Sequence, residues 1–232
     1  MNVLISQRHA INNHGQWCDS LENDYVRCFA AFGITLFPVP NNSGGLNTLI
    51  QTVRPSGIIL SGGGDVSPAF SGGESLDDAQ VSVVRDQIEA ALLDHALRER
   101  IPVLGICRGL QFINVYFKGT LIPDLNRLVP GKSHPCPGTH LLSIRHKDLV
   151  TLLGGNASVE VNSYHHQGVT QGALAQELRQ FAVVMDLGII EGLYHPDHLL
   201  AAVQWHPERA AETTPLDKIL IEAFRDGTLF WR

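Results

Sequence analysis

Apolar and polar positions in the first half of the chain alternate between the period of strands and the period of helices. Short apolar runs of strand length lie at 2–6, 34–39, 57–60 and 102–106. Between them, helical spacing occurs at 19–31, 46–53 and 81–100, with glycine and proline at the turns. Strands that alternate with helices predict a parallel, doubly wound sheet with ligands bound at the carboxyl ends of its strands.

Three local patterns in this half make specific predictions. Residues 7–17 are polar and predict a loop. Asp19 followed by Glu22 has the form of a capping box and predicts a helix start there. The helix over 81–100 has Val84, Ile88, Ala91, Leu92 and His95 on or near one face, the pattern of an amphipathic helix with an apolar packing face.

The second half of the chain has shorter apolar runs and one long stretch without periodicity. Strands are predicted at 141–145, 158–162, 181–186, 189–194 and 200–204, and a closing helix at 215–224. The proline- and glycine-rich stretch 123–139 predicts either an ordered loop over the ligand edge or a flexible lid. Because no internal repeat or linker interrupts the pattern, we predict a single domain over residues 1–232.

Composition narrows the classes of partner. The chain has 232 residues, 44% of them hydrophobic, which suffices for a substantial core, and a net charge of -6. This charge and the absence of basic runs argue against a nucleic-acid partner, whereas small anionic substrates remain compatible. No apolar stretch is long enough for a membrane span, and no signal peptide is visible. Four cysteines without repeated spacing indicate a reducing compartment, so we expect a cytoplasmic protein.

Cys107 lies where the predicted strand 102–106 gives way to helical spacing, between Gly105 and Gly109. This G-x-C-x-G spacing is typical of a nucleophile elbow, in which small residues let strand and helix approach. A thiol at a helix N-terminus is favoured as thiolate, the form that attacks. The alternative is an inert cysteine buried after a core strand.

The loop after the third predicted strand, residues 61–68, reads S-G-G-G-D-V-S-P. Successive glycines leave backbone N–H groups uncovered, as a site for an oxyanion requires. The loop lacks the lysine and the spacing of a phosphate-binding loop, so a nucleotide site is not favoured. A plain flexible turn is the alternative.

A cysteine nucleophile needs a base, and the stretch 202–208, A-V-Q-W-H-P-E, supplies one. His206 follows a predicted strand, and Glu208 lies two residues on, close enough to orient the imidazole. The alternative is a surface turn.

A metal site is conceivable at His134, Cys136 and His140. A loop is the better interpretation of this stretch, because prolines interrupt it and no second pair of ligands lies nearby. We therefore predict no metal.

Two motifs together, G-I-C-R-G-L-Q at 105–111 and Q-W-H-P-E at 204–208, resemble those of the class I glutamine amidotransferase superfamily. Three further motifs look closer to the γ-glutamyl hydrolase branch of this superfamily, which includes γ-glutamyl-γ-aminobutyrate hydrolases. They are V-N-S-Y-H-H-Q-G at 161–168, L-S-G-G-G-D at 60–65 and the R-D pair at Arg85. The resemblance implies a flavodoxin-like α/β fold, with a mostly parallel sheet, helices on both faces and a short antiparallel extension.

The resemblance also implies roles for individual residues and no cofactor. Cys107 would be the nucleophile, His206 the base and Glu208 its orienter. The backbone N–H groups of Gly63 and Arg108 would form the oxyanion hole. D-L-G-I-I-E at 186–191 carries one residue more than the similar family motif, which puts a binding role for Glu191 in doubt. The residues expected to bind the substrate are Gly62, Gln111, Asn162, Ser163, Tyr164 and His165.

A smaller subgroup shares I-S-Q-R at 5–8, V-P-N at 39–41 and W-H-P-E-R at 205–209. Its members act on γ-glutamyl derivatives of nucleotide phosphoramidates in surface-polysaccharide modification. By this likeness Arg8 would also bind substrate, because an arginine at a strand's carboxyl end can meet an anionic leaving group. A surface arginine or a structural ion pair is the alternative for Arg8.

The expected function is hydrolysis of a small-molecule γ-glutamyl amide, through a γ-glutamyl thioester, to glutamate and an amine. One alternative is a glutaminase subunit that delivers ammonia to a separate synthetase. A second, of another class, is a non-catalytic binding or regulatory protein on the same fold; an intact Cys107, His206 and Glu208 set argues against it.

Overall fold

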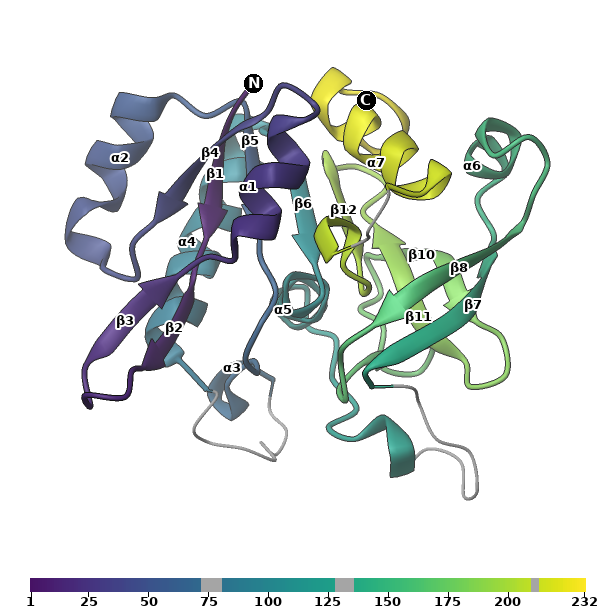
Figure 1. Cartoon of the computed structure of the whole chain (residues 1–232), viewed down its shortest axis with the longest axis horizontal. Helices are drawn as coiled ribbons and strands as arrows, with labels where there is room; N and C mark the ends of the chain where they lie inside the picture. The colour runs from purple at the N-terminus through teal and green to yellow at the C-terminus, as the bar shows by residue number, and fades with distance from the viewer. Residues whose placement is uncertain (72–80, 128–135, 210–212) are drawn as a thin grey trace.

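The computed structural model describes residues 1–71, 81–127, 136–209 and 213–232, and its centre is a ten-stranded sheet (Figure 1). Five parallel strands form one half, in the order β4, β1, β5, β6 and β12. Antiparallel strands β11, β10, β7 and β8 extend it, and the short β9 pairs with β11. The strands are β1 (Asn2–Ser6), β4 (Thr35–Val39), β5 (Gly57–Leu60), β6 (Val103–Ile106), β7 (Gly138–Ile144), β8 (Ser158–Ser163), β9 (Val169–Thr170), β10 (Arg179–Val184), β11 (Ile189–Tyr194) and β12 (Leu200–Val203).

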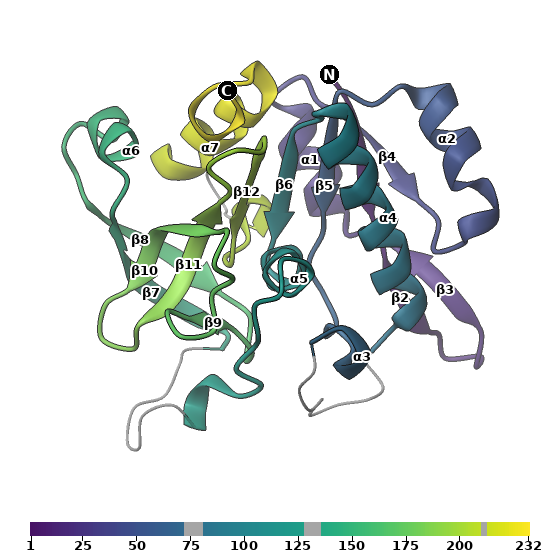
Figure 2. The ribbon, with the colours of Figure 1, turned by 180° about the vertical axis from the view of Figure 1, so that it is seen from behind.

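Helices cover both faces of the parallel half (Figures 1 and 2). α1 (Asn23–Ala30) and α7 (Pro215–Asp226) lie on one face. α2 (Leu46–Val53), α4 (Val83–Glu99) and α5 (Arg108–Tyr116) lie on the other. Strands β5, β6 and β12 are buried at every position, which explains why they read as continuous apolar runs. The α/β fold predicted from the sequence is confirmed.

Each face of the sheet has its own apolar core. Phe29 of α1 and Phe224 of α7 pack on one face, whereas Leu92 of α4 and Phe112 of α5 pack on the other. A capping box between Thr214 and Asp217 starts α7. The shorter helices are α3 (Pro68–Ser71), α6 (Lys147–Leu152) and the 3-10 turns η1 (Ser43–Gly45), η3 (Leu125–Arg127), η4 (Pro207–Arg209) and η5 (Leu229–Trp231).

The polar stretch 7–17 is not a simple loop, contrary to the prediction. β2 (Arg8–Ile11) and β3 (Trp17–Ser20) form an antiparallel hairpin that projects from the main sheet (Figure 1). The predicted capping box at Asp19 is also wrong, because α1 starts later, at Asn23, and Asp19 belongs to β3. The Asp19 carboxylate instead accepts hydrogen bonds from the backbone N–H and the side-chain amide of Asn41.

The predicted packing face of α4 is partly wrong. Ile88 and Leu92 are buried as expected, but Val84 is 41% exposed. The buried face instead contains three charged residues, Arg85, Asp86 and Glu89.

Of the stretch 123–139, residues 128–135 lie outside the described residues, and the remainder holds η3 and the start of β7. None of the helices in the described ranges combines the length and hydropathy needed to cross a membrane.

Candidate active site

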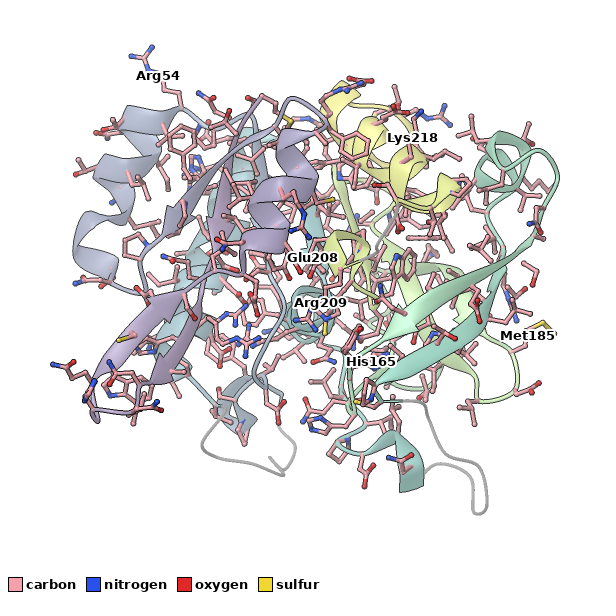
Figure 3. All side chains as sticks on the ribbon, in the orientation of Figure 1. Arg54, His165, Met185, Glu208, Arg209 and Lys218 are labelled. Atoms are coloured by element: carbon pink, nitrogen blue, oxygen red, sulfur yellow. The ribbon has the colours of Figure 1, made fainter. Side chains whose placement is uncertain are left out.

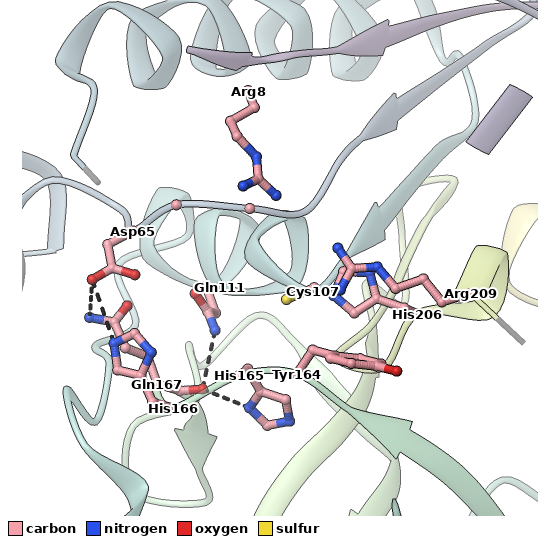
Figure 4. Close-up of a pocket in the computed structure, with 12 residues that line it drawn as sticks. Arg8, Asp65, Cys107, Gln111, Tyr164, His165, His166, Gln167, His206 and Arg209 are labelled. Carbon is pink, nitrogen blue, oxygen red and sulfur yellow. Dashed lines mark hydrogen bonds and ion pairs between the residues drawn. The ribbon is translucent and has the colours of Figure 1, made fainter. Parts of the chain in front are cut away.

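The parallel half of the sheet brings the candidate residues to one edge. β1, β5, β6 and β12 run in the same direction, so the residues that follow them meet where these strands end. Arg8 follows β1, the glycine loop follows β5, Cys107 follows β6 and His206 follows β12. Figure 3 shows Glu208, Arg209 and His165 near the same central region, and Figure 4 shows the site itself.

Cys107 occupies the sharp turn predicted between strand and helix. Its φ of 53° and ψ of -103° lie outside the regions that a cysteine ordinarily adopts, and α5 begins at the next residue. A Cβ on Gly109 would clash with the carbonyl oxygen of Leu60, and one on Gly105 would lie 2.9 Å from the backbone of Gly109. The two glycines therefore allow helix and strand to approach closely enough to form the elbow.

His206 and Glu208 form a buried pair beside this elbow. The Nδ1 of His206 lies 2.5 Å from the Oε1 of Glu208, and both residues are 2% exposed. With the Nδ1 proton donated to the carboxylate, Nε2 is the ring nitrogen left to interact with the thiol. Asn162 fixes the His206 backbone, since its amide oxygen accepts from the N–H at 2.9 Å and its amide nitrogen donates to the carbonyl at 2.8 Å.

The surroundings shift both partners toward an ion pair. Burial raises the pKa of Cys107, but the charge and hydrogen bond of His206 outweigh it, so the thiol pKa is lowered. Burial lowers the pKa of His206, but Cys107 and Glu208 outweigh it and raise the pKa to about 9. Both shifts favour the ion pair of a thiolate and an imidazolium, the reactive form of a cysteine nucleophile.

The glycine loop runs past the elbow. The Gly62 N–H donates to the Tyr25 hydroxyl at 2.9 Å, and a Cβ on Gly62 would lie 2.7 Å from the His206 ring. Gly63, with φ of +86°, lines the pocket. Arg108 is the first residue of α5, where backbone N–H groups have no intrahelical acceptor. The loop and the helix start thus lie on either side of the thiol, as an oxyanion site requires.

Cys107 opens into a pocket of about 190 Å³ (Figure 4). Of the residues expected to bind substrate, Arg8, Gln111, Tyr164 and His165 line it. The structure does not bring Gly62, Asn162 or Ser163 into this lining. Residues without an assigned role from the sequence complete it, although all lie in quoted motifs; these are Gly64, Asp65, His166, Gln167 and Arg209.

One wall of the pocket is a polar network between the loop after β8, Gln111 of α5 and Asp65 of the glycine loop. The Gln167 carbonyl lies 3.2 Å from the Gln111 amide nitrogen and 2.9 Å from His165 Nδ1. The Gln167 amide donates to Asp65 at 3.3 Å, and His166 lies 3.6 Å from the same carboxylate. Burial lowers the pKa of His165, but Glu191 and Cys107 outweigh it and raise the pKa. This wall therefore offers both donors and acceptors to a polar substrate.

Glu191 supports this wall from behind rather than lining it. Its carboxylate lies 3.4 Å from His165 and 3.2 Å from His140 and is fully buried. Burial raises the pKa of Glu191, but the two histidines outweigh it and lower the pKa to about 2. His140, weighed above as a metal ligand, thus contacts Glu191, while His134 lies outside the described residues. Among the described residues, no group of three potential ligands is placed to hold a metal ion.

Two arginines lie at the mouth of the pocket. Arg8 forms an ion pair with Glu22 at 2.6 Å, and Arg209 approaches the same carboxylate at 3.7 Å. The Arg209 guanidinium also stacks over the Tyr164 ring, 4.9 Å from its centroid. Arg8 therefore forms the ion pair given above as the alternative, and it also lines the pocket.

Comparison with known proteins gives one family match and several relatives. Residues 2–208 match the family described as Peptidase C26. The glutamine amidotransferase-like protein YvdE of Lactococcus lactis is 38% identical over 179 residues, covering 74% of each chain. The γ-glutamyl-γ-aminobutyrate hydrolase PuuD of Escherichia coli is 32% identical over 193 residues, covering 76% of this chain and 74% of PuuD.

A solved structure supports the fold independently. The glutaminase domain of Trypanosoma brucei CTPS, solved with bound acivicin, superimposes with a TM-score of 0.61. The alignment covers 100% of this chain and 96% of that domain at 14% sequence identity. These matches agree with the class I glutamine amidotransferase-like fold expected from the motifs at the elbow and at His206.

Proposed function

Because the chain belongs to the peptidase C26 family, we propose that it is a cysteine-dependent hydrolase that cleaves a small γ-glutamyl amide to glutamate and an amine. The observation that carries this proposal is the buried thiol and imidazole pair, oriented by Glu208 at 2.5 Å and open to a polar pocket. The relation to PuuD supports the γ-glutamyl specificity, and the three side chains are arranged as a nucleophile, a base and an orienter.

The proposed reaction is acyl transfer in two halves. The Cys107 thiolate attacks the γ-carbonyl carbon, and the negative oxygen accepts hydrogen bonds from the N–H groups of Gly63 and Arg108. His206 gives its Nε2 proton to the leaving amine as the carbon–nitrogen bond breaks, which leaves a γ-glutamyl thioester. The same nitrogen then takes a proton from water, whose oxygen attacks the thioester and releases glutamate and the thiolate.

We further propose that the leaving amine carries an acidic group. Arg8 and Arg209 both line the pocket, and the Glu22 carboxylate pairs with Arg8 and approaches Arg209. Arg209 also lies 3.7 Å from Glu208, a carboxylate that is already paired with His206. Two guanidinium groups at one pocket can donate to an acidic group on the leaving amine. Both γ-glutamyl-γ-aminobutyrate, with a carboxylate, and a γ-glutamyl nucleotide phosphoramidate, with phosphates, fit this description.

A screen of γ-glutamyl amides, scored by glutamate release, tests the proposal. The two acidic compounds above are compared with neutral γ-glutamyl-butylamide and with glutamine. We expect turnover of an acidic amide by the native protein, none by Cys107→Ala, and a KM about tenfold higher in Arg8→Gln or Arg209→Gln for acidic amides only. Arg98→Gln, an exposed arginine remote from the pocket, serves as the matched control.

Two outcomes of the screen would contradict the proposal. Release of ammonia from glutamine only when a synthetase partner is bound would identify a glutaminase subunit instead. Failure of every compound to acylate Cys107, read by intact-mass measurement, would favour a non-catalytic binding protein.

A further inference from the structure

The buried face of α4 forms an ion cluster with the first residue of α5. Arg85, Asp86 and Glu89 come from α4 and Arg108 from α5, and none is more than 2% exposed. The two arginines and two acids balance in charge. Glu89 pairs with Arg85 at 2.9 Å and also with Arg108, and Asp86 pairs with Arg108. None of the four residues lines the pocket, and of the cluster only the Arg108 backbone N–H takes part in the reaction steps above.

Arg85 holds the glycine loop by its carbonyl groups. Its guanidinium donates to the carbonyl oxygens of Ser61 at 2.7 Å, Gly62 at 3.2 Å and Gly63 at 2.6 Å. In a trans peptide the carbonyl and the following N–H point in opposite directions. A Gly62 carbonyl fixed toward Arg85 therefore turns the Gly63 N–H away from α4. The peptide between Ser61 and Gly62 shows the same arrangement, since its carbonyl accepts from Arg85 while its N–H donates to the Tyr25 hydroxyl on the other side.

Arg108 ties the other half of the oxyanion site to the same cluster. Its side chain is bound by both Glu89 and Asp86, while its backbone N–H belongs to the peptide that follows Cys107. Asp86 also accepts from the backbone N–H of Ser67, at the end of the glycine loop. Glu89 is linked to the start of the loop through Ser6, whose hydroxyl donates to Glu89 at 2.8 Å and accepts from the Ser61 N–H at 2.9 Å.

We propose that Arg85 is a positioning residue of the oxyanion hole, and that its cluster with Glu89 and Arg108 sets the two backbone donors relative to each other. The proposal rests on the function proposed above, because it requires a tetrahedral oxyanion. A buried ion cluster is not by itself a strong source of stability, since apolar side chains of similar volume often stabilise as well. The chemistry of Arg85 suits orientation instead, because a planar fork of donors can span several carbonyls at once.

The experiment compares Arg85→Met and Arg85→Lys with the native protein. A lysine keeps the charge beside Glu89 but presents a single nitrogen, which cannot span three carbonyls. Displacement of a donor by about 1 Å can cost about 100-fold in rate. We expect kcat for a γ-glutamyl amide to fall about 10- to 100-fold in both variants, with KM within about threefold of the native value.

A second readout separates the oxyanion hole from the nucleophile. Alkylation of Cys107 by iodoacetamide needs the thiolate but forms no oxyanion, so its rate and pH profile are expected to stay within about twofold of the native values. Leu92→Ala is the matched control, because Leu92 lies on the same helix, fully buried but outside the cluster. It is expected to lower thermal stability without lowering kcat.

If the Arg85 variants do not fold, Ser6→Ala tests the inference instead, because it keeps all four charges of the cluster but removes the link from Glu89 to the glycine loop. We expect kcat to fall about threefold to tenfold in Ser6→Ala. Unchanged kcat in Arg85→Lys or, where that protein does not fold, in Ser6→Ala would overturn the inference. Equal losses of kcat and of alkylation rate would also overturn it, since they indicate a general collapse of the site. A native protein that releases glutamate from no γ-glutamyl amide would instead contradict the proposed function itself.

Discussion

The immediate neighbours of Cys107 determine the direction in which its thiol pKa is shifted. A thiol this deeply buried would ordinarily resist ionisation, because burial disfavours the charged form. The His206 imidazole reverses that tendency, and Glu208 in turn favours the protonated imidazole. The three residues therefore depend on one another, and the loss of one changes the charge state of the others.

The first prediction concerns the alkaline limit of activity. The pKa of His206 is raised to about 9, so the imidazolium that donates a proton to the leaving amine persists through neutral pH and is lost above about pH 9. We expect kcat/KM to decline on that side with an apparent pKa near this value. In Glu208→Gln the limb is expected at lower pH, because a carboxylate that raises the His206 pKa is gone. Measured pH profiles that keep the same alkaline limb in both proteins would contradict this account.

At the level of elements, the turn that carries His206 is held by a neighbouring strand. Asn162 at the end of β8 exchanges two hydrogen bonds with the His206 backbone, although the sequence suggested that it binds substrate. The antiparallel extension thus fixes the backbone of His206, while Cys107 follows a strand of the parallel half.

We therefore expect Asn162→Ala to lower kcat about tenfold or more with little change in KM. Asn162→Asp is expected to be more harmful, because a carboxylate oxygen would face the His206 carbonyl where the amide nitrogen now donates at 2.8 Å. Asn156→Ala is the control, since Asn156 caps the turn before the same strand far from His206. Steady-state kinetics check the prediction, and a rise in KM alone would indicate a substrate contact instead.

The buried face of α4 shows where hydrophobic periodicity stops being informative. Periodicity placed Val84 toward the sheet, but Arg85 is buried in its place because Glu89 and three loop carbonyls satisfy it. Those partners include a loop more than twenty residues away, which local spacing does not encode. The β2–β3 hairpin escaped prediction for a related reason. It packs little apolar surface, so its strands lack the alternation that marks a half-buried strand.

At the level of the whole molecule, the sequence predicted the strands of both halves of the sheet, but it predicted the strand arrangement only for the parallel half. The strand-end positions of Cys107 and His206 followed from continuous apolar runs in the parallel half, where order along the chain predicts a shared edge. The pocket wall from Tyr164 to Gln167 follows β8, whose place at the far end of the sheet depends on long-range antiparallel pairing. In the sequence, only the motif at 161–168 indicated that these wall residues belong to the site.

Glu191 links stability of this wall to pH. Its pKa is lowered from 4.5 to about 2 in the fold, so its stabilisation is fully present above about pH 4.5 and is lost as the pH falls toward 2. Removing this charge in Glu191→Gln is expected to lower the free energy of unfolding by about 3 kcal/mol at pH 7. At pH 3 the gap in unfolding free energy between the native protein and Glu191→Gln is expected to be about 2 kcal/mol smaller.

Urea unfolding at several pH values measures this difference, with Glu160→Gln, an exposed glutamate of β8, as the control. A cost of Glu191→Gln that stays constant between pH 7 and pH 3 would show that the charge of Glu191 does not stabilise the fold.

The central claim is that Cys107 is acylated by a γ-glutamyl group, and acid-quenched intact-mass measurement tests it most directly. The native protein, mixed with an acidic γ-glutamyl amide, is expected to gain the mass of one γ-glutamyl group at Cys107 and to release glutamate. Cys107→Ala is expected to remain folded, gain no mass and release none. Glutamate release by Cys107→Ala at an undiminished rate would contradict the account.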